Sequence, residues 1–262
     1  MFNSKFANFT VFFILLIFTL VLGYFENGYH WAWIPLSAIA YIVLVAAGSF
    51  FIRWNFYFKS INRIPLLQMK FINQKFQIQQ RNLQIILSFD DGPHENTPEI
   101  LNILAKENIK AQFFLIGKNI VGKEDIVKQM HKDGHQIGNH SYLHGNNFDW
   151  KSSKAIVQEI EKTNEIIFNI TGENPKYFRP PYGVTTPNIG KALEIMELVS
   201  VGWTVRSLDT TAKDEAKLIA KIAKETVPGA IILLHDRCDI TKKILPKLIQ
   251  QLRQKGFEFT IL

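Results

Sequence analysis

The sequence predicts a parallel α/β domain that begins near residue 83, either a closed barrel or an open doubly wound sheet. Short apolar runs of strand length alternate with helical patterns over about 180 residues, and polar clusters follow several of the runs. No glycine-rich phosphate loop follows the first strand, which disfavours a dinucleotide-binding sheet. The predicted strands are residues 84–89, 111–116, 136–139, 177–179, 199–204, 230–235 and 258–262.

The helices between these strands have recognisable starts. Thr97-Pro98 and Thr186-Pro187 each place a capping side chain before a proline that suits the first helical turn. In the other connections, apolar residues recur every three or four positions. These patterns predict helices after Thr97 and Thr186 and in residues 123–131, 152–169, 213–226 and 241–254.

Two apolar segments precede this domain. Residues 9–24 and 31–52 contain no charged side chain, and each approaches the ~17–25 residues that a helix needs to cross a bilayer. Because the polar link between them is short, we expect a transmembrane helical hairpin in residues 1–58, with helices at about 9–25 and 31–52. A cleaved signal peptide and a buried core hairpin are the alternatives. Residues 59–82 are expected to form a juxtamembrane connector to a domain at 83–262.

Positive charge is concentrated around the apolar segments. Residues 1–81 carry seven basic side chains and one acidic side chain, and the rest of the chain is nearly neutral. Basic residues flank the pair of segments but are missing from the link between them, a pattern that places both termini in the cytoplasm. We therefore expect a multi-pass protein of a bacterial-type cytoplasmic (inner) membrane, with the α/β domain in the cytoplasm and membrane lipids as partners. The C-terminal part lacks basic and aromatic interleaving, so nucleic acid is not an expected partner.

Two adjacent carboxylates, Asp90 and Asp91, end the first predicted strand in the run SFDDGP. Neighbouring carboxylates repel each other unless a cation binds one of them. A surface turn is the simpler interpretation of this run alone, because Asp-Gly-Pro is ordinary turn chemistry.

Two histidines, His140 and His144, end the third predicted strand in the run HSYLH. Imidazoles four residues apart can face one metal ion if the intervening residues form a helical turn, although such pairs are commonly incidental. With a carboxylate from the first strand they would form a site that suits Zn, Fe, Co or Ni. Cys238 is the only cysteine, which excludes a multi-cysteine zinc site and an intrachain disulfide.

Further polar residues follow the later strands. Arg179 begins the run RPPYG, where its guanidinium could fix a neighbouring carboxylate. His235 ends a hydrophobic strand in the run LLHD, and Asp209 is a candidate partner that would orient it. Taken singly, a plain turn or a satisfied core histidine explains these residues. Their order at successive strand ends favours one common site, since function gathers at the C-terminal ends of barrel strands.

The motifs resemble those of the polysaccharide deacetylase family with a NodB homology domain, carbohydrate esterase family 4. SFDDGP, HSYLH, RPPYG, the stretch from Trp203 to Asp209 and LLHD match the five family motifs in order and spacing. The resemblance covers roughly residues 83–262 and implies a deformed (β/α) barrel of about seven strands. It also implies a metal-dependent hydrolase that removes N-acetyl groups from amino sugars of a glycan or glycoconjugate.

The resemblance assigns a role to each residue of the expected site. Asp90 would be the general base, tethered by Arg179, and His235 would protonate the departing amine. Asp209 would orient His235, and the backbone N–H of Tyr182 would help to bind the oxyanion. The residues expected to bind a divalent metal, with Zn favoured and Co, Fe or Ni as alternatives, are Asp91, His140 and His144.

The fourth motif departs from the family pattern. Arg206 stands where members usually carry an aspartate, and Thr210 stands where an aromatic residue usually follows the second aspartate. The acid and its partner survive, but the acyl pocket and the sugar groove are expected to differ from those of the family.

Two other functions compete with glycan deacetylation. One is a deformylase or deacetylase of a lipid-linked sugar at the cytoplasmic membrane face, which the expected anchor and orientation favour. The other is a membrane-tethered glycan-binding protein without turnover, in which sugar binding would survive loss of the metal.

Overall fold

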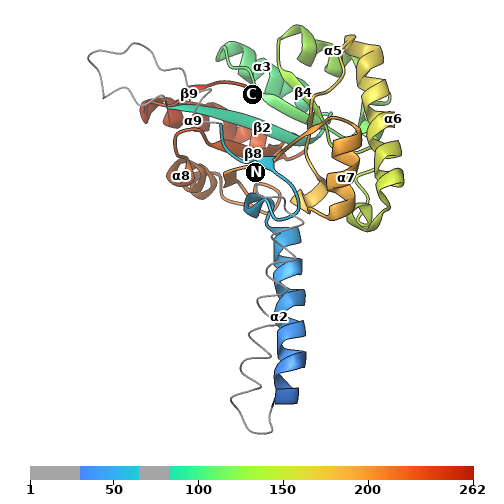
Figure 1. Cartoon of the computed structure of the whole chain (residues 1–262). Helices are drawn as coiled ribbons and strands as arrows, with labels where there is room; N and C mark the ends of the chain where they lie inside the picture. The colour runs from blue at the N-terminus through green and yellow to red at the C-terminus, as the bar shows by residue number, and fades with distance from the viewer. Residues whose placement is uncertain (1–29, 65–82) are drawn as a thin grey trace, which may run out of the picture.

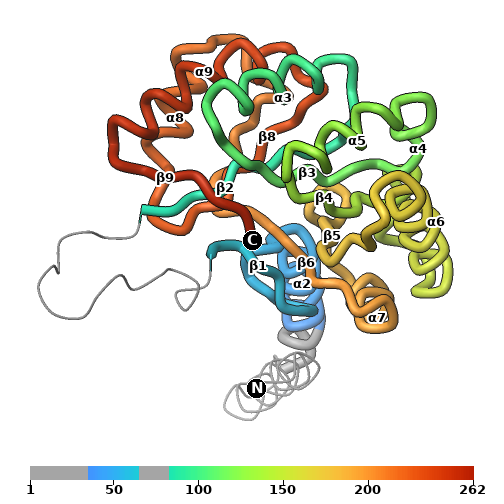
Figure 2. Tube along the Cα trace, turned by 90° about the horizontal axis from the view of Figure 1, so that it is seen from above, coloured from blue at the N-terminus to red at the C-terminus, as the bar shows by residue number. Residues whose placement is uncertain are grey.

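The computed structural model describes residues 30–64 and 83–262, and a curled parallel sheet lies at its centre (Figures 1 and 2). Its strands lie in the order β1-β6-β5-β4-β3-β2-β8-β7, and β9 pairs with β2 beside this path. The strands are β1 (Ser60–Ile61), β2 (Gln84–Gly92), β3 (Gln112–Leu115), β4 (Gln136–Asn139), β5 (Tyr177–Phe178), β6 (Val199–Val201), β7 (Val205–Arg206), β8 (Ile231–His235) and β9 (Glu258–Phe259).

Helices form an outer ring around the sheet (Figure 2), whereas one helix, α2, extends away from it (Figure 1). The α-helices are α2 (His30–Phe50), α3 (Thr97–Lys106), α4 (Gly117–Ile120), α5 (Glu124–Lys132), α6 (Ser153–Thr171), α7 (Pro187–Ile195), α8 (Glu215–Glu225) and α9 (Asp239–Gln254). Short 3₁₀ turns are η1 (Ile52–Trp54), η2 (Phe148–Trp150) and η3 (Pro181–Gly183).

Strand β2 shows how the sheet separates its two faces. Ile85, Leu87 and Phe89 pack outward in the large core beneath the helices, where Phe89 stacks on Phe113. Ile86 belongs to an inner cluster with residues of β3, β6 and β8. Because successive side chains alternate between faces, the inner face of β2 continues from Ile86 to Asp90. Apart from Ser88, the buried side chains of the strand are therefore apolar on both faces until it reaches the site, as expected for a covered parallel sheet.

The strand order favours the barrel over the open doubly wound sheet. From β6 to β2 each strand lies beside its neighbour in sequence, without the reversal that defines a doubly wound sheet. All the paired strands are parallel. The architecture is a curled parallel α/β sheet, consistent with the predicted deformed barrel.

Most predicted elements coincide with observed ones, and β4 has the predicted bounds. The Thr186 side chain caps α7 by accepting from the Ile189 N–H, as predicted. Strands β1 and β7 were not assigned from the sequence, because two residues are too few for an alternating pattern to show. Strand β1 lies within residues 59–82, which the sequence analysis treated as a connector.

The N-terminal predictions fall partly outside the described residues. The first expected helix, at about 9–25, lies wholly in that part of the chain, whereas α2 occupies nearly the span expected for the second. Within residues 30–64 and 83–262, no helix has the length and the apolar character needed to cross a membrane. The transmembrane hairpin gains no support from the structure and stays a prediction.

Candidate active site

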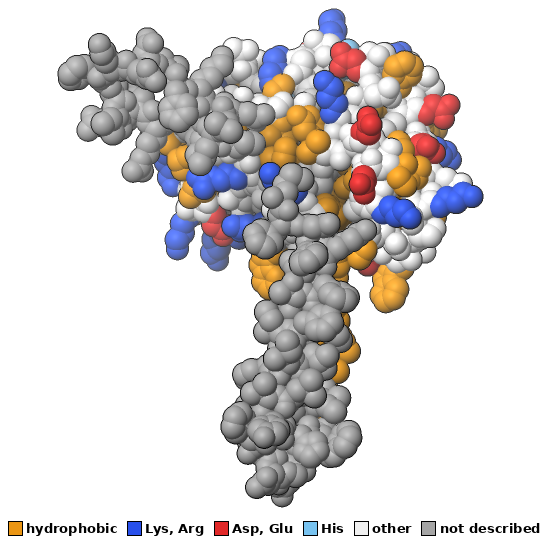
Figure 3. All heavy atoms as spheres, in the orientation of Figure 1, with side chains coloured by type: hydrophobic (Ala, Val, Ile, Leu, Met, Phe, Trp, Pro, Cys, Tyr) orange, Lys and Arg blue, Asp and Glu red, His pale blue; other side chains and the backbone are white. Residues whose placement is uncertain are grey.

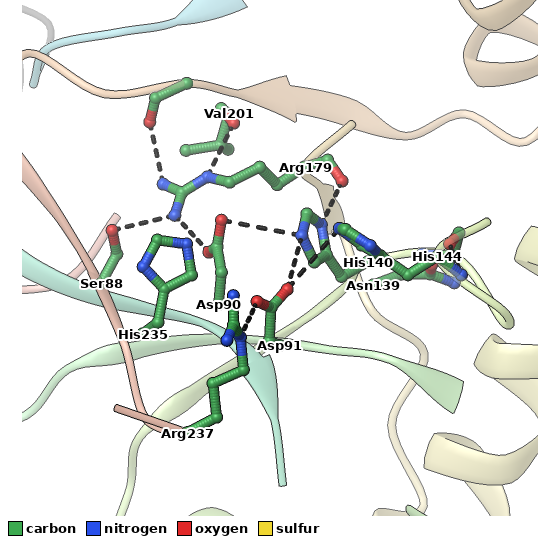
Figure 4. Close-up of polar contacts among 12 residues, drawn as sticks. Ser88, Asp90, Asp91, Asn139, His140, His144, Arg179, Val201, His235 and Arg237 are labelled. Carbon is green, nitrogen blue, oxygen red and sulfur yellow. Dashed lines mark hydrogen bonds and ion pairs between the residues drawn. The ribbon is translucent and has the colours of Figure 1, made fainter. Parts of the chain in front are cut away.

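All eight predicted site residues lie at the carboxyl ends of the strands or in the loops that follow them, and Figure 4 shows the centre of the group. Parallel strands present their carboxyl ends at the same edge, which is why residues distant in sequence meet here. Asp90 and His235, for example, are register partners on the adjacent strands β2 and β8.

The three predicted metal ligands come together at this edge. One ligand atom each from Asp91, His140 and His144 lies within 4.8 Å of the other two. The Nε2 atoms of His140 and His144 each lie 3.6 Å from Asp91 Oδ1. Two imidazole nitrogens and a carboxylate oxygen thus converge on one point, as the ligands of a divalent cation do.

The hydrogen bonds and charges around this group suit a metal site. His140 Nδ1 lies 2.6 Å from the Arg179 carbonyl oxygen, which only accepts, so Nδ1 carries a proton and Nε2 is the nitrogen turned toward Asp91. Burial, followed by the neighbouring His140, lowers the pKa of His144 to about 4. Burial raises the pKa of Asp91, but His140 and Arg237 outweigh it and bring that pKa below the ordinary value. The donor set therefore fits a divalent cation.

The backbone of the site is held in an unusual conformation. In the first three motifs, four residues that are not glycine have positive φ angles: Asp91 (72°), Ser141 (64°), His144 (52°) and Tyr182 (58°). This left-handed region is uncommon for residues with a β-carbon, and such residues gather at functional sites. The turns thus direct these side chains toward the site at a conformational cost that the surrounding contacts must offset.

Asp90 is held by a buried arginine. Arg179 Nη1 donates to Asp90 Oδ1 at 2.6 Å and to Ser88 Oγ at 3.0 Å. The same guanidinium donates to the carbonyl groups of Val201 and Gly202 at 3.1 and 2.8 Å. Arg179 is fully buried, so these acceptors set its position and its charge remains beside Asp90. The predicted tether between the two residues is present.

His235 has the predicted carboxylate partner. Its Nδ1 lies 2.8 Å from Asp209 Oδ1, and its backbone N–H donates to Asp209 Oδ2 at 2.7 Å. Thr241 Oγ donates to the same Oδ2 at 2.6 Å, which fixes the carboxylate. Burial lowers the pKa of His235, but the hydrogen bond and charge of Asp209 outweigh it and raise that pKa above the ordinary value. His235 is thus suited to carry a proton near neutral pH.

Tyr182 lies at the rim of the site. Its ring is about half exposed and packs on the His144 ring with 4.5 Å between centroids. Its hydroxyl donates to Asn146 Oδ1 at 2.6 Å. No residue in the described part of the chain accepts a hydrogen bond from the Tyr182 backbone N–H. That N–H remains available for a ligand, in keeping with its predicted role.

Sequence reasoning missed Arg237. Its Nε donates to Asp91 Oδ2 at 2.7 Å, on the carboxylate oxygen that does not face the histidines. The only available signal was its place two residues after His235, at the end of a strand that carries site residues. Ser88 was missed for a similar reason, because a lone serine inside an apolar strand has no pattern of its own.

The fourth-motif departures leave the hydrogen bonds between His235 and Asp209 intact. Arg206 and Thr210 are both exposed. Between them in the sequence, Ser207 Oγ donates to Asp209 Oδ1 at 2.9 Å. Neither exposed side chain makes a hydrogen bond or ion pair with Asp209 or His235 in the described structure, so the substitutions concern the surroundings of the site.

The chain is similar in sequence to known deacetylases. Residues 78–201 match the polysaccharide deacetylase family. The peptidoglycan-N-acetylglucosamine deacetylase PgdA of Listeria monocytogenes is 32% identical over 68% of this chain. A peptidoglycan-N-acetylglucosamine deacetylase of Bacillus cereus is 36% identical over 66% of this chain and 67% of its own length. The match spans only 38% of the length of the Listeria relative.

Solved structures share the fold. The Bc1960 peptidoglycan N-acetylglucosamine deacetylase, solved in complex with an N-hydroxybenzamide compound, is 35% identical over 69% of this chain and 86% of its own, with a TM-score of 0.64. BA3943 of Bacillus anthracis, described as a pseudoenzyme, is 29% identical over 68% of this chain and 63% of its own, also with a TM-score of 0.64. The same fold therefore occurs with and without activity. By its sequence and fold, the chain belongs to the polysaccharide deacetylase family, carbohydrate esterase family 4.

Proposed function

We propose that the chain hydrolyses the N-acetyl group of an amino sugar in a peptidoglycan-like glycan. One observation supports this above all: a convergent Asp–His–His set lies beside a carboxylate held by Arg179 and a histidine held by Asp209. A base, an acid and a cation site together are what amide hydrolysis demands. The substrate class follows the Listeria and Bacillus relatives, which are named for peptidoglycan N-acetylglucosamine.

Asp91, His140 and His144 would hold a divalent cation, and zinc is the ion that we propose. When bound, the cation supplies Lewis acidity toward the amide carbonyl and the attacking water. Two neutral imidazoles and one carboxylate also suit cobalt, iron and nickel. Metal analysis of the purified chain therefore forms part of the test.

The protein residues would carry the protons of the reaction. Asp90 accepts a proton from the attacking water, while Arg179 keeps the carboxylate in place. The Tyr182 N–H donates to the oxyanion that forms as the water oxygen bonds to the acyl carbon. His235 gives its proton to the nitrogen as the C–N bond breaks, and Asp209 stabilises the charged imidazole. The products are acetate and a free amino sugar.

A lipid-linked amino sugar is the second candidate substrate. Thr185, two residues after Gly183 of the Tyr182 loop, binds the end of α2: its N–H donates to Ser49 O at 2.9 Å and its hydroxyl to Gly48 O at 3.2 Å. Along α2, large apolar side chains are exposed, among them Leu36, Ile39, Ile42 and Val43. Figure 3 shows hydrophobic side chains where α2 is visible, whereas charged ones are spread over the domain. An apolar helix fixed next to a site loop favours a substrate that is itself partly apolar.

With this second substrate, we propose that the chain acts at the cytoplasmic face of a membrane. The flanking basic residues and the exposed apolar side chains of α2 support this location. A single engineered cysteine on α6, in a chain with Cys238 replaced, tests it with an impermeant thiol reagent on intact cells. Labelling of intact cells would contradict the cytoplasmic placement and favour an external glycan.

The activity is tested on the full-length chain loaded with zinc. We expect acetate release from N-acetylglucosamine oligomers, and a comparison with lipid-linked N-acetylated sugars ranks the two substrates. Asp90→Asn should lower kcat by about 10²–10⁴-fold, the usual contribution of a general base. A glycan-binding protein without turnover would instead bind the oligomers equally well in both forms and release no acetate from either.

A further inference from the structure

Residues 52–64 complete the barrel on the side where Arg179 is anchored. Strand β1 pairs with β6, with Ser60 opposite Ser200 and Ile61 opposite Val201. The Ser60 and Ser200 hydroxyls lie 2.7 Å apart in the interior. Farther along, the Ile64 N–H donates to Gly229 O at 2.9 Å, just before β8. This segment therefore connects the β6 end of the sheet to β8, and Figure 2 shows β1 beside β6.

The backbone that β1 supports is the backbone that holds Arg179. On one side of this stretch, the Gly202 N–H donates to Ile61 O at 2.9 Å. On the other side, the Val201 and Gly202 carbonyls accept from Arg179 Nε and Nη2 (Figure 4). With these two groups anchored, the planar guanidinium directs Nη1 at Asp90. A displacement of the Val201–Gly202 backbone would therefore move the Asp90 carboxylate.

Gly202 lies tightly against residues 52–62. A β-carbon at this position would lie 2.0 Å from Asn62 Oδ1 and 3.3 Å from Ile52 Cδ1. Asn62 is held there because its Nδ2 donates to Ser60 O and Asn55 Oδ1, each at 3.2 Å. Ile52 is buried with Trp203 and Leu233. A methyl group at position 202 would therefore force the Asn62 side chain to move.

We propose that residues 52–62 are a positioning element for the base, acting through Gly202 and Arg179 on Asp90. This rests on the proposed function, since it assigns the segment a part in the same reaction. The segment lies outside residues 78–201, the part matched to the family. From the sequence, its residues 52–58 were expected to belong to the hairpin and its residues 59–62 to the connector. It touches neither the base nor the cation ligands, so its action is indirect.

The test uses a double-mutant cycle in the full-length chain. Gly202→Ala should lower kcat about tenfold or more with little change in KM, because small misplacements of reacting groups are costly. Asn62→Ala removes the nearest obstacle to the new methyl group. The double variant should therefore be more active than Gly202→Ala alone, a coupling that independent sites do not show. Each variant is also measured for thermal unfolding and for hydrogen exchange of residues 199–206 and 176–182.

Gly190→Ala is the matched control. Its β-carbon would lie 2.9 Å from Phe58 Cδ1, so it presses on the same N-terminal segment at α7, away from Arg179. We expect its kcat to stay at the wild-type value. An equal loss of kcat in Gly190→Ala, or no rescue in the double variant, would overturn the proposal. If the wild type releases no acetate, the proposed function fails. The positioning element is still supported if hydrogen exchange in residues 199–206 and 176–182 is faster in Gly202→Ala than in the wild type and returns to the wild-type rate in the double variant.

Discussion

In Figure 4, His235 lies on one side of the Asp90–Asp91 pair, and His140 and His144 lie on the other. His235 Nδ1 is 2.8 Å from a carboxylate oxygen of Asp209. His144 Nε2 is 3.6 Å from Asp91 Oδ1, which His140 approaches equally closely. Burial lowers the pKa of both His144 and His235, but only His235 has a close carboxylate that reverses the effect.

The comparison shows how surroundings can suit one residue type to two chemical purposes at the same edge of the sheet. Desolvation favours the neutral imidazole, which offers the lone pair that a cation needs. A carboxylate at hydrogen-bond distance favours the imidazolium, which holds the proton that a leaving amine needs. The difference therefore depends on Asp209 and on Thr241, which fixes it. Substitutions on each side of the site test this difference between the histidines.

The largest effect on activity is expected when one of the proposed metal ligands is removed. His144→Ala removes one of three converging ligands and should abolish stoichiometric zinc binding, with a loss of acetate release on the order of 10²–10³-fold or more. Zinc content and turnover are measured on the same preparations. His131→Ala, on α5 and outside the site, is the control and should retain both. Full zinc content in His144→Ala would exclude this residue as a ligand.

A smaller effect on activity is expected when the partner of His235 is changed. Asp209 raises the pKa of His235, so the imidazole should stay protonated above its ordinary value of about 6.5. Activity should thus be lost at high pH, as His235 deprotonates. In Asp209→Asn, burial remains but the opposing charge is gone, so the basic limb of the kcat profile should move to lower pH. A basic limb that does not move would show that His235 is not the acid.

The site was more predictable from the sequence than the contacts that support it. Asp90, His140 and His235 stand in short motifs at the ends of apolar strands, so residue type and position both reveal them. Their roles as base, ligand and acid stay predictions until they are tested. The supporting contacts are long-range instead, as when Arg237 bonds Asp91 across 146 positions of sequence.

The same reasoning applies to the fold. Strands such as β2 and β8 contain apolar runs before the site, and such runs are recognisable from the sequence. Strand β1 has two residues in a stretch that reads as an aromatic and basic linker. Its place in the sheet depends on pairing with β6, 140 positions away, between Ser60 and Ser200. Local pattern cannot reveal such a strand, because its stability comes from the partner.

The smallest effect is expected on metal affinity when Arg237, the partner of Asp91, is changed. Its side chain is 49% exposed and donates through Nε to Asp91 Oδ2 at 2.7 Å. Arg237→Gln removes this bond and its charge, so the pKa of Asp91 should rise and protons should compete better with the metal. Partners of a ligand typically contribute 10–100-fold in metal affinity, and because this one is half exposed we expect about tenfold. Zinc titrations across acidic pH measure the loss, which should grow as pH falls. Arg253→Gln, an arginine of similar exposure paired with Glu107, is the control, and an equal loss of affinity there would assign the effect to net charge.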